Sequence, residues 1–208
     1  MALTKISRGL LNTGVSDSSD ATAITIDSSE NVTLAGTING ITIKADATNF
    51  TDSILISQNA STGTLSSATD NVGIGDDVFA SLTSGRNSVA IGSNALDANT
   101  SGKNNVAVGH DALSGNTTAD NNTGVGKSAL EANTTGASNT AVGSGALDAN
   151  TTASENTAFG FDALGANTTG DGNTAIGVKA MDANTVGDRN VAVGSEALGA
   201  MNPSTNAD

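Results

Sequence analysis

A repeat with a 17-residue period constrains the fold of this chain more than any other feature. Glycine recurs at this spacing, with no insertion, at Gly75, Gly92, Gly109, Gly126, Gly143, Gly160, Gly177 and Gly194. The unit is too short for a helix-turn-helix repeat, which exceeds about 30 residues, or for a propeller blade of about 40. It fits one coil of a parallel β-solenoid whose coils stack about 4.8 Å apart. The sequence therefore predicts an all-β rod.

The predicted strand of each coil precedes its glycine and alternates large with small side chains. The residue directly before the glycine is large, as in Ile74 and Val108, and the one before that is Ala or Gly. Alternation with period two places the two kinds on opposite faces. We expect the Ala and Gly face to admit another backbone or subunit. We expect the coil interior to hold one Leu and one or two β-branched residues per layer.

Two further columns of the repeat have predicted structural roles. The fourth residue after each glycine is expected to fill the coil: Phe79, Leu96, Leu113, Leu130, Leu147, Leu164, Met181 and Leu198. Asn recurs where the strand starts (Asn71, Asn105, Asn122, Asn139, Asn156, Asn173, Asn190) and after the Leu segment (Asn99, Asn116, Asn133, Asn150, Asn167, Asn184). Asn tolerates left-handed turns, which we predict as its main role, and stacked Asn residues also form amide ladders.

Composition excludes several classes of function. The formal charge of -13 repels nucleic-acid phosphates and anionic lipid, so we expect no nucleic-acid partner. No apolar stretch approaches the roughly 18 residues that a membrane-spanning helix needs, and we expect no membrane insertion. The absence of Cys excludes thiolate metal sites. His110, the only histidine, follows Gly109 at a variable position and is expected to be solvated, so we predict no enzyme, no cofactor and no metal site.

Two polar columns permit a functional interpretation beside a simpler one. Asp97, Glu131, Asp148 and Asp182 share one column, which is either a weak collector of divalent cations or, as we favour, a solvated acidic stripe. A Thr column could template ice: Thr100, Thr117, Thr134, Thr151, Thr168 and Thr185. These Thr residues follow Asn in a turn and not on a flat strand, so ice binding is the less favoured function.

The chain is predicted to have five segments. Residues 1–20 form an N-terminal segment, 21–44 short intertwined β-strands, 45–70 a connector, 71–202 the eight-coil solenoid and 203–208 a polar tail. Within the connector, Ile54 and Ile56 indicate a degenerate capping coil whose spacing to the first full unit differs by one residue. The low apolar content per coil leads us to predict an obligate oligomer.

The start of this acidic chain is basic and apolar. It contains Leu3, Lys5, Ile6, Arg8, Leu10 and Leu11. One interpretation is a segment that anchors the protein on a larger body. The other is a frayed terminus with incidental charges.

The repeats NSVAIGSNALDANTSG, NNVAVGHDAL and NTAIGVKAMDANTVG resemble the YadA-like heads of trimeric autotransporter adhesins. The resemblance covers residues 71 to about 200 and implies a left-handed parallel β-roll with three chains packed side by side. The loop ANTTG is longer than in those heads, which gives the unit its 17-residue length.

The long loop and the start TKISRGLLNTGVSDSSDATAITIDSSENVTLAGTINGITI look more like tail-fibre or capsid-fibre proteins of marine bacteriophages. That resemblance implies a homotrimeric structural fibre in the virion, whose N-terminus docks on other virion proteins and whose solenoid projects outward to aid host attachment. The alternative is an adhesin head on a bacterial surface that binds a host directly. An adhesin is expected to carry a signal peptide and a membrane-anchor barrel, and we recognise neither, which favours the phage interpretation.

Overall fold

The computed structural model describes residues 63–200 throughout and, before them, the strands at 24–26, 32–34, 37–38, 41–47 and 50–57. The chain divides into two compact units, Met1–Thr37 and Ile38–Asp208. In the first, β1 (Ile24–Ile26) pairs antiparallel with β2 (Val32–Leu34). A two-residue strand, β3 (Thr37–Ile38), follows in sequence. The predicted anchoring segment 1–20 and the tail 203–208 lie outside the described residues.

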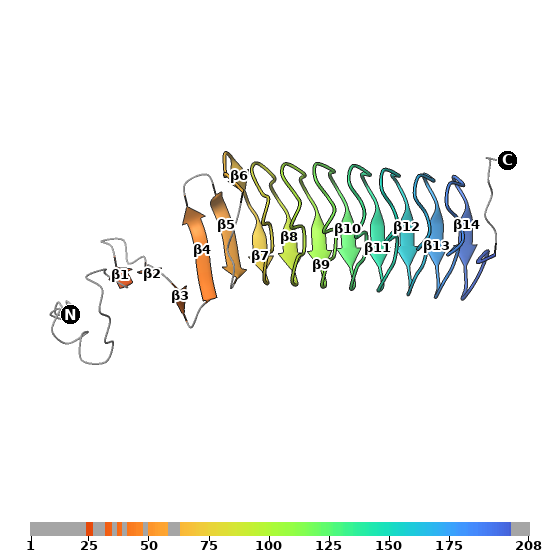
Figure 1. Cartoon of the computed structure of the whole chain (residues 1–208), viewed down its shortest axis with the longest axis horizontal. Helices are drawn as coiled ribbons and strands as arrows, with labels where there is room; N and C mark the ends of the chain where they lie inside the picture. The colour runs from red at the N-terminus through yellow and green to blue at the C-terminus, as the bar shows by residue number, and fades with distance from the viewer. Residues whose placement is uncertain are drawn as a thin grey trace, which may run out of the picture. The chain divides into compact units, whose positions relative to one another are not determined.

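The second unit is a β-solenoid with one short strand per coil, as the 17-residue period predicts. The strands are β7 (Val72–Ile74), β8 (Val89–Ile91), β9 (Val106–Val108), β10 (Thr123–Val125), β11 (Thr140–Val142), β12 (Thr157–Phe159), β13 (Thr174–Ile176) and β14 (Val191–Val193). Each pairs in parallel with the next, and corresponding residues of the repeat lie directly opposite each other, as Val125 lies opposite Val142. The described residues contain no helix. The coils therefore stack in strict register (Figure 1).

A β-hairpin covers the N-terminal end of this stack. It consists of β4 (Ile41–Ala47) and β5 (Phe50–Ser57), which pair antiparallel, and β5 also pairs in parallel with β7 and with β6 (Ala68–Thr69). Ile54 lies opposite Val72, and Leu55 lies opposite Gly73. Both pairs exceed the period of the repeat by one position, which is the offset that the sequence indicated for a capping coil. Leu55, between the two predicted Ile residues, points inward and is fully buried.

The core of the solenoid is made of Leu, Ala and Asn. The Leu column is buried as predicted, except in the last coil, where Leu198 is 38 % exposed. The small residues of each strand, such as Ala107 and Ala141, are fully buried and join the same core cluster. The predicted subunit contact through the Ala and Gly face is therefore wrong, because that face points into the coil. The expectation of β-branched residues inside every coil is also wrong: the strands turn Val and Ile outward, and Ala lies beside Leu in the interior, with Val78 of the first coil as a buried exception.

The two Asn columns form buried hydrogen-bond ladders. After the Leu segment, the amide of Asn133 donates from Nδ2 to Oδ1 of Asn116, and that of Asn150 donates to Oδ1 of Asn133. Where the strands start, Oδ1 of Asn122 accepts the backbone N–H of Asn139. Members of both columns are fully buried. Among the described residues, no buried side-chain nitrogen or oxygen lacks a partner.

Left-handed turns occur at other positions than the sequence indicated. None of the Asn residues in the two predicted columns has a positive φ. Three other positions of each coil have left-handed backbone conformations. They are the residue before the strand-start Asn, such as Asn121, the second residue after the repeat glycine, such as Ser128, and the buried Leu, such as Leu130. A left-handed Leu is strained. Complete burial of its side chain offsets that strain.

Candidate functional site

The outward side of the strands is an uncharged surface of mostly apolar side chains, which we call the outer strand face. It consists of two residues per coil: Val72, Ile74, Val89, Ile91, Val106, Val108, Thr123, Val125, Thr140, Val142, Thr157, Phe159, Thr174, Ile176, Val191 and Val193. Every member is partly or largely exposed. None carries a charge, although the chain as a whole has a formal charge of -13. Charge depletion of this kind is typical of the centre of a protein interface.

Parallel pairing explains the shape of this face. The eight strands align Val, Ile, Thr and Phe side chains in two straight columns, because each residue lies opposite its counterpart in the next coil. The result is a continuous, uncharged and mostly apolar strip along the solenoid. Sequence reasoning found the alternation of large and small residues but expected a subunit contact on the Ala and Gly side, which is buried inside the coil.

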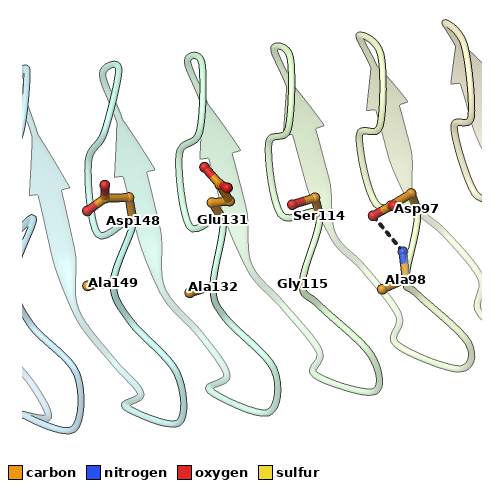
Figure 2. A pocket seen from close by; sticks show the side chains of 8 residues that line it. All are labelled: Asp97, Ala98, Ser114, Gly115, Glu131, Ala132, Asp148 and Ala149. Carbon is orange, nitrogen blue, oxygen red and sulfur yellow. Dashed lines mark hydrogen bonds between the residues drawn. The ribbon is translucent and has the colours of Figure 1, made fainter.

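A shallow acidic groove lies elsewhere on the coils. It has a volume of about 450 Å³ and is lined by Asp97, Ala98, Ser114, Gly115, Glu131, Ala132, Asp148 and Ala149. Four successive coils contribute Asp97, Ser114, Glu131 and Asp148, and small residues lie beside them (Figure 2). Three members of the predicted acidic column, Asp97, Glu131 and Asp148, therefore meet in one groove, and Asp182 follows farther along the stack.

Partial burial raises the pKa of two of these carboxyl groups. Desolvation is the largest cause for both Asp97 and Asp148. Neighbouring negative charges add to it, from Asp111 beside Asp97 and from Asp162 beside Asp148. The backbone N–H of Ala98, which donates to Oδ1 of Asp97 at 2.8 Å, acts in the opposite direction. The ionised groove is thus a local cost to the fold at neutral pH.

Replacing Asp97 by Asn is expected to raise the melting temperature at pH 7. A carboxyl group whose pKa is raised on folding stabilises the folded state when protonated, and this contribution is lost as the pH rises through the raised pKa. Asn keeps an oxygen for the Ala98 N–H and removes the charge. Solvent screening limits the gain to less than about 1 kcal/mol. Melting curves at pH 7 and pH 3 test this, and an equal gain at both values would show that charge is not the cause.

The remaining candidates from the sequence are His110 and possible metal ligands. The side chain of His110 is exposed, and its Nδ1 lies 2.6 Å from Oδ2 of Asp111. Within the described part of the chain, no group of three or more His, Cys, Asp or Glu side chains is placed to hold a metal ion. No helix in that part is long and apolar enough to cross a membrane.

The Thr column has its hydroxyl groups occupied. Oγ1 of Thr100 donates to the carbonyl oxygen of Thr117, and Oγ1 of Thr134 donates to that of Thr151. The same bond recurs in the coils between and after them. These hydroxyl donors connect successive coils, so they are not available to order water on a surface.

The repeat glycines occupy the same position in each coil. The repeat glycines follow each strand with φ between 130° and 143°. The basic and apolar residues Leu3, Lys5, Ile6, Arg8, Leu10 and Leu11 lie outside the described residues.

Comparisons with known proteins give no relative. No family model, no curated protein and no solved structure matches this chain.

Proposed function

We propose that this protein is a structural fibre of a bacteriophage virion: a non-enzymatic homotrimer whose N-terminus docks on the particle and whose solenoid projects outward. The observation that carries the proposal is the outer strand face, an uncharged and mostly apolar strip that extends over all eight coils. A strip of this kind is a surface for association with another protein. The resemblance of the repeats to trimeric adhesin heads and to phage fibres supplies the number of chains and the setting.

The outer strand face is the surface on which three copies meet. The chain carries 21 acidic against 8 basic residues, so most approaches of one copy to another are repulsive. Contact through the two uncharged columns avoids that repulsion and removes Val, Ile and Phe from water. The buried Ala and Gly column cannot provide such a contact. This arrangement places the acidic groove and the polar loops on the outside of the fibre.

The polarity of the fibre rests on charge and on resemblance. In the described part of the chain the β4–β5 hairpin covers the N-terminal end of the stack, and the basic residues Lys5 and Arg8 precede this hairpin in sequence. In the phage fibres that the chain resembles, the N-terminal segment attaches to the virion. The solenoid then acts as a shaft that aids attachment to the host surface.

Deleting residues 1–20 is expected to abolish incorporation into virions while the deleted chain still forms trimers. The deletion removes the proposed anchor and leaves the outer strand face intact. The measurement is the amount of protein in purified particles by immunoblot, with imaging of the particle to locate the fibre, and we expect a loss of at least about tenfold.

Deletion of residues 203–208 is the matched control, because it shortens the opposite terminus and is expected to leave incorporation unchanged. Full incorporation of the chain without residues 1–20 would contradict the anchor. Binding of the full chain to host cells or glycans, without particle incorporation, would favour the alternative function of a bacterial surface adhesin.

A further inference from the structure

An interface built from repeated coils can form in several registers, because one copy can shift along another by a whole coil. Each coil of the outer strand face presents nearly the same two residues as the next, one period later in the sequence. A copy that slides along its neighbour by one coil meets almost the same surface. In the column directly before the repeat glycine, most members are Val or Ile, which differ by one methylene group, so they penalise such a slip little. One element must distinguish the aligned arrangement from the slipped ones.

Phe159 is the largest departure from the repeat on this face, because the other changes exchange Val, Ile and Thr, which are β-branched side chains of similar size. It occupies the column in which every other coil has Val or Ile, directly opposite Val142 and Ile176 in the neighbouring strands. Its side chain is 56 % exposed, whereas its strand neighbour Ala158 is fully buried. The chain has four aromatic residues, and an interior position would have removed this one from water.

We propose that Phe159 sets the register of the three chains, an inference that rests on the proposed homotrimer. Around a three-fold axis that runs along the stack, residues of the same coil meet at the same level. The three Phe159 side chains then form one aromatic cluster on the axis. A slip of one coil places Phe159 of one chain against Val142 or Ile176 of another. The aligned register alone brings the rings together.

The penalty for a slip has two parts. The aligned cluster loses aromatic contacts, which favour paired rings beyond their buried area. The slipped arrangement also places a large ring against a smaller side chain at one level and leaves a gap at another, which breaks close packing. Each of the three chains loses aromatic contacts and close packing when the register slips. The aligned register is therefore favoured by about tenfold or more over a slip.

Phe161 provides a matched comparison. It is exposed to a similar degree, at 49 %, but it lies after Gly160, beyond the end of β12. Its column is polar in most coils, with His110 and Lys127 at the equivalent positions. Phe161 is therefore outside the two columns that face the axis. Replacing it by Val makes the same change in side chain without changing the outer strand face.

The register is measurable by disulfide cross-linking, because the natural chain has no Cys. Val108 and Val125 lie opposite each other in adjacent strands of the same column. In coexpressed full-length chains that carry V108C or V125C, with a size tag on one of them, disulfides between two copies of one variant report the aligned register. Disulfides between the two variants report a slip of one coil, because that slip displaces the partner by about 4.8 Å. Disulfides form only when the two Cα atoms are about 4.4 to 6.8 Å apart.

We expect mostly aligned disulfides in the natural background and a rise of about tenfold in the ratio of slipped to aligned disulfides with F159V. F161V is expected to leave the ratio unchanged. Adding V142F to F159V is expected to return the ratio of slipped to aligned disulfides to that of the natural chain, because the aligned register again brings three rings to one level. This rescue separates a role in register from general loss of stability.

The failures of the two proposals are distinguishable. Trimers in sedimentation whose disulfide ratio is the same with F159V as without it would overturn the role of Phe159 and leave the homotrimer standing. An equal rise of the slipped-to-aligned ratio with F161V would assign the effect to loss of exposed apolar surface in general, and it would also overturn the specific role of Phe159. A natural chain that sediments as a monomer would overturn the homotrimer and the register together.

Discussion

Replacing Asn133 by Asp is expected to destabilise the solenoid by about 3 to 5 kcal/mol. Asn133 is fully buried, and its Nδ2 donates to Oδ1 of Asn116 at 3.1 Å and to the carbonyl oxygen of Gly136 at 2.9 Å. Its own Oδ1 accepts a hydrogen bond from Asn150 at 2.8 Å. Asp has almost the same shape but no amide donor. A carboxylate at this place faces two oxygen atoms without a hydrogen between them and carries a charge that no cation offsets.

Urea unfolding of N133D at pH 7 tests this expectation, and N121D is its matched control. Asn121 belongs to an exposed ladder, where its Oδ1 accepts Nδ2 of Asn104 at 3.1 Å. Asp keeps that acceptor and remains in water, so we expect a change within about 0.5 kcal/mol. The loss with N133D is expected to shrink at acid pH, because protonation restores one donor. Similar losses for the two variants would show that the buried amide ladder does not hold the coils together.

Replacing Gly126 by Ala is expected to cost about 3 kcal/mol or more. A Cβ atom at this position would collide with the carbonyl oxygen of Gly143 and lie 2.5 Å from its carbonyl carbon. The backbone φ of 139° is also unfavourable for a residue with a side chain. Both obstacles involve backbone atoms of a stacked coil, which cannot move without separating the strands. The closeness of the coils is thus the reason for glycine here.

Gly194 allows the two causes to be separated. Its φ of 131° is similar, but it lies in the last coil, and the nearest atom to an added Cβ is that of Ala197 at 3.8 Å. G194A therefore has the backbone strain without the collision, and we expect it to cost clearly less than G126A in the same urea experiment. Equal losses would mean that the collision with the next coil contributes nothing.

The sequence was sufficient to predict the architecture because the period is visible along the chain. The spacing of the repeat glycines gave the coil, and the Leu column gave its main interior residue, as Leu113 and Leu130 show. The offset of Ile54 indicated the capping strand that pairs with β7. These inferences depend on the spacing of residues along the chain and on the presence of one large apolar residue per coil. Neither depends on the width of the coil.

The orientation of the strand could not be predicted from alternation, because period two separates two faces without saying which is inside. Ranking by hydrophobicity would place Val142 inside and Ala141 outside, and the structure has the reverse. The deciding factor is space: in this coil Leu147 fills the interior together with the small residues Ala141 and Ala146. The volume available follows from three-dimensional packing of the whole coil.

The amide ladders predicted for the Asn columns are confirmed, but their main predicted role in left-handed turns is wrong, because Asn is a frequent turn residue and was assigned as one. A signal was nevertheless present in the sequence. The columns of Asn122 and Asn133 keep Asn in almost every coil, whereas true turn positions, such as those of Asn121 and Ser128, vary among residue types. A polar residue that does not vary along a repeat indicates burial with specific hydrogen bonds.

Sedimentation equilibrium of the full chain tests the central claim most directly. The uncharged outer strand face predicts association, and the resemblance to trimeric fibres and adhesin heads predicts one species of three chains, at protein concentrations down to the micromolar range and at physiological salt. Higher salt should leave the species unchanged or favour it, because the contact is apolar and the remaining surface is repulsive. A single monomeric species, folded by its far-ultraviolet spectrum, would contradict the account.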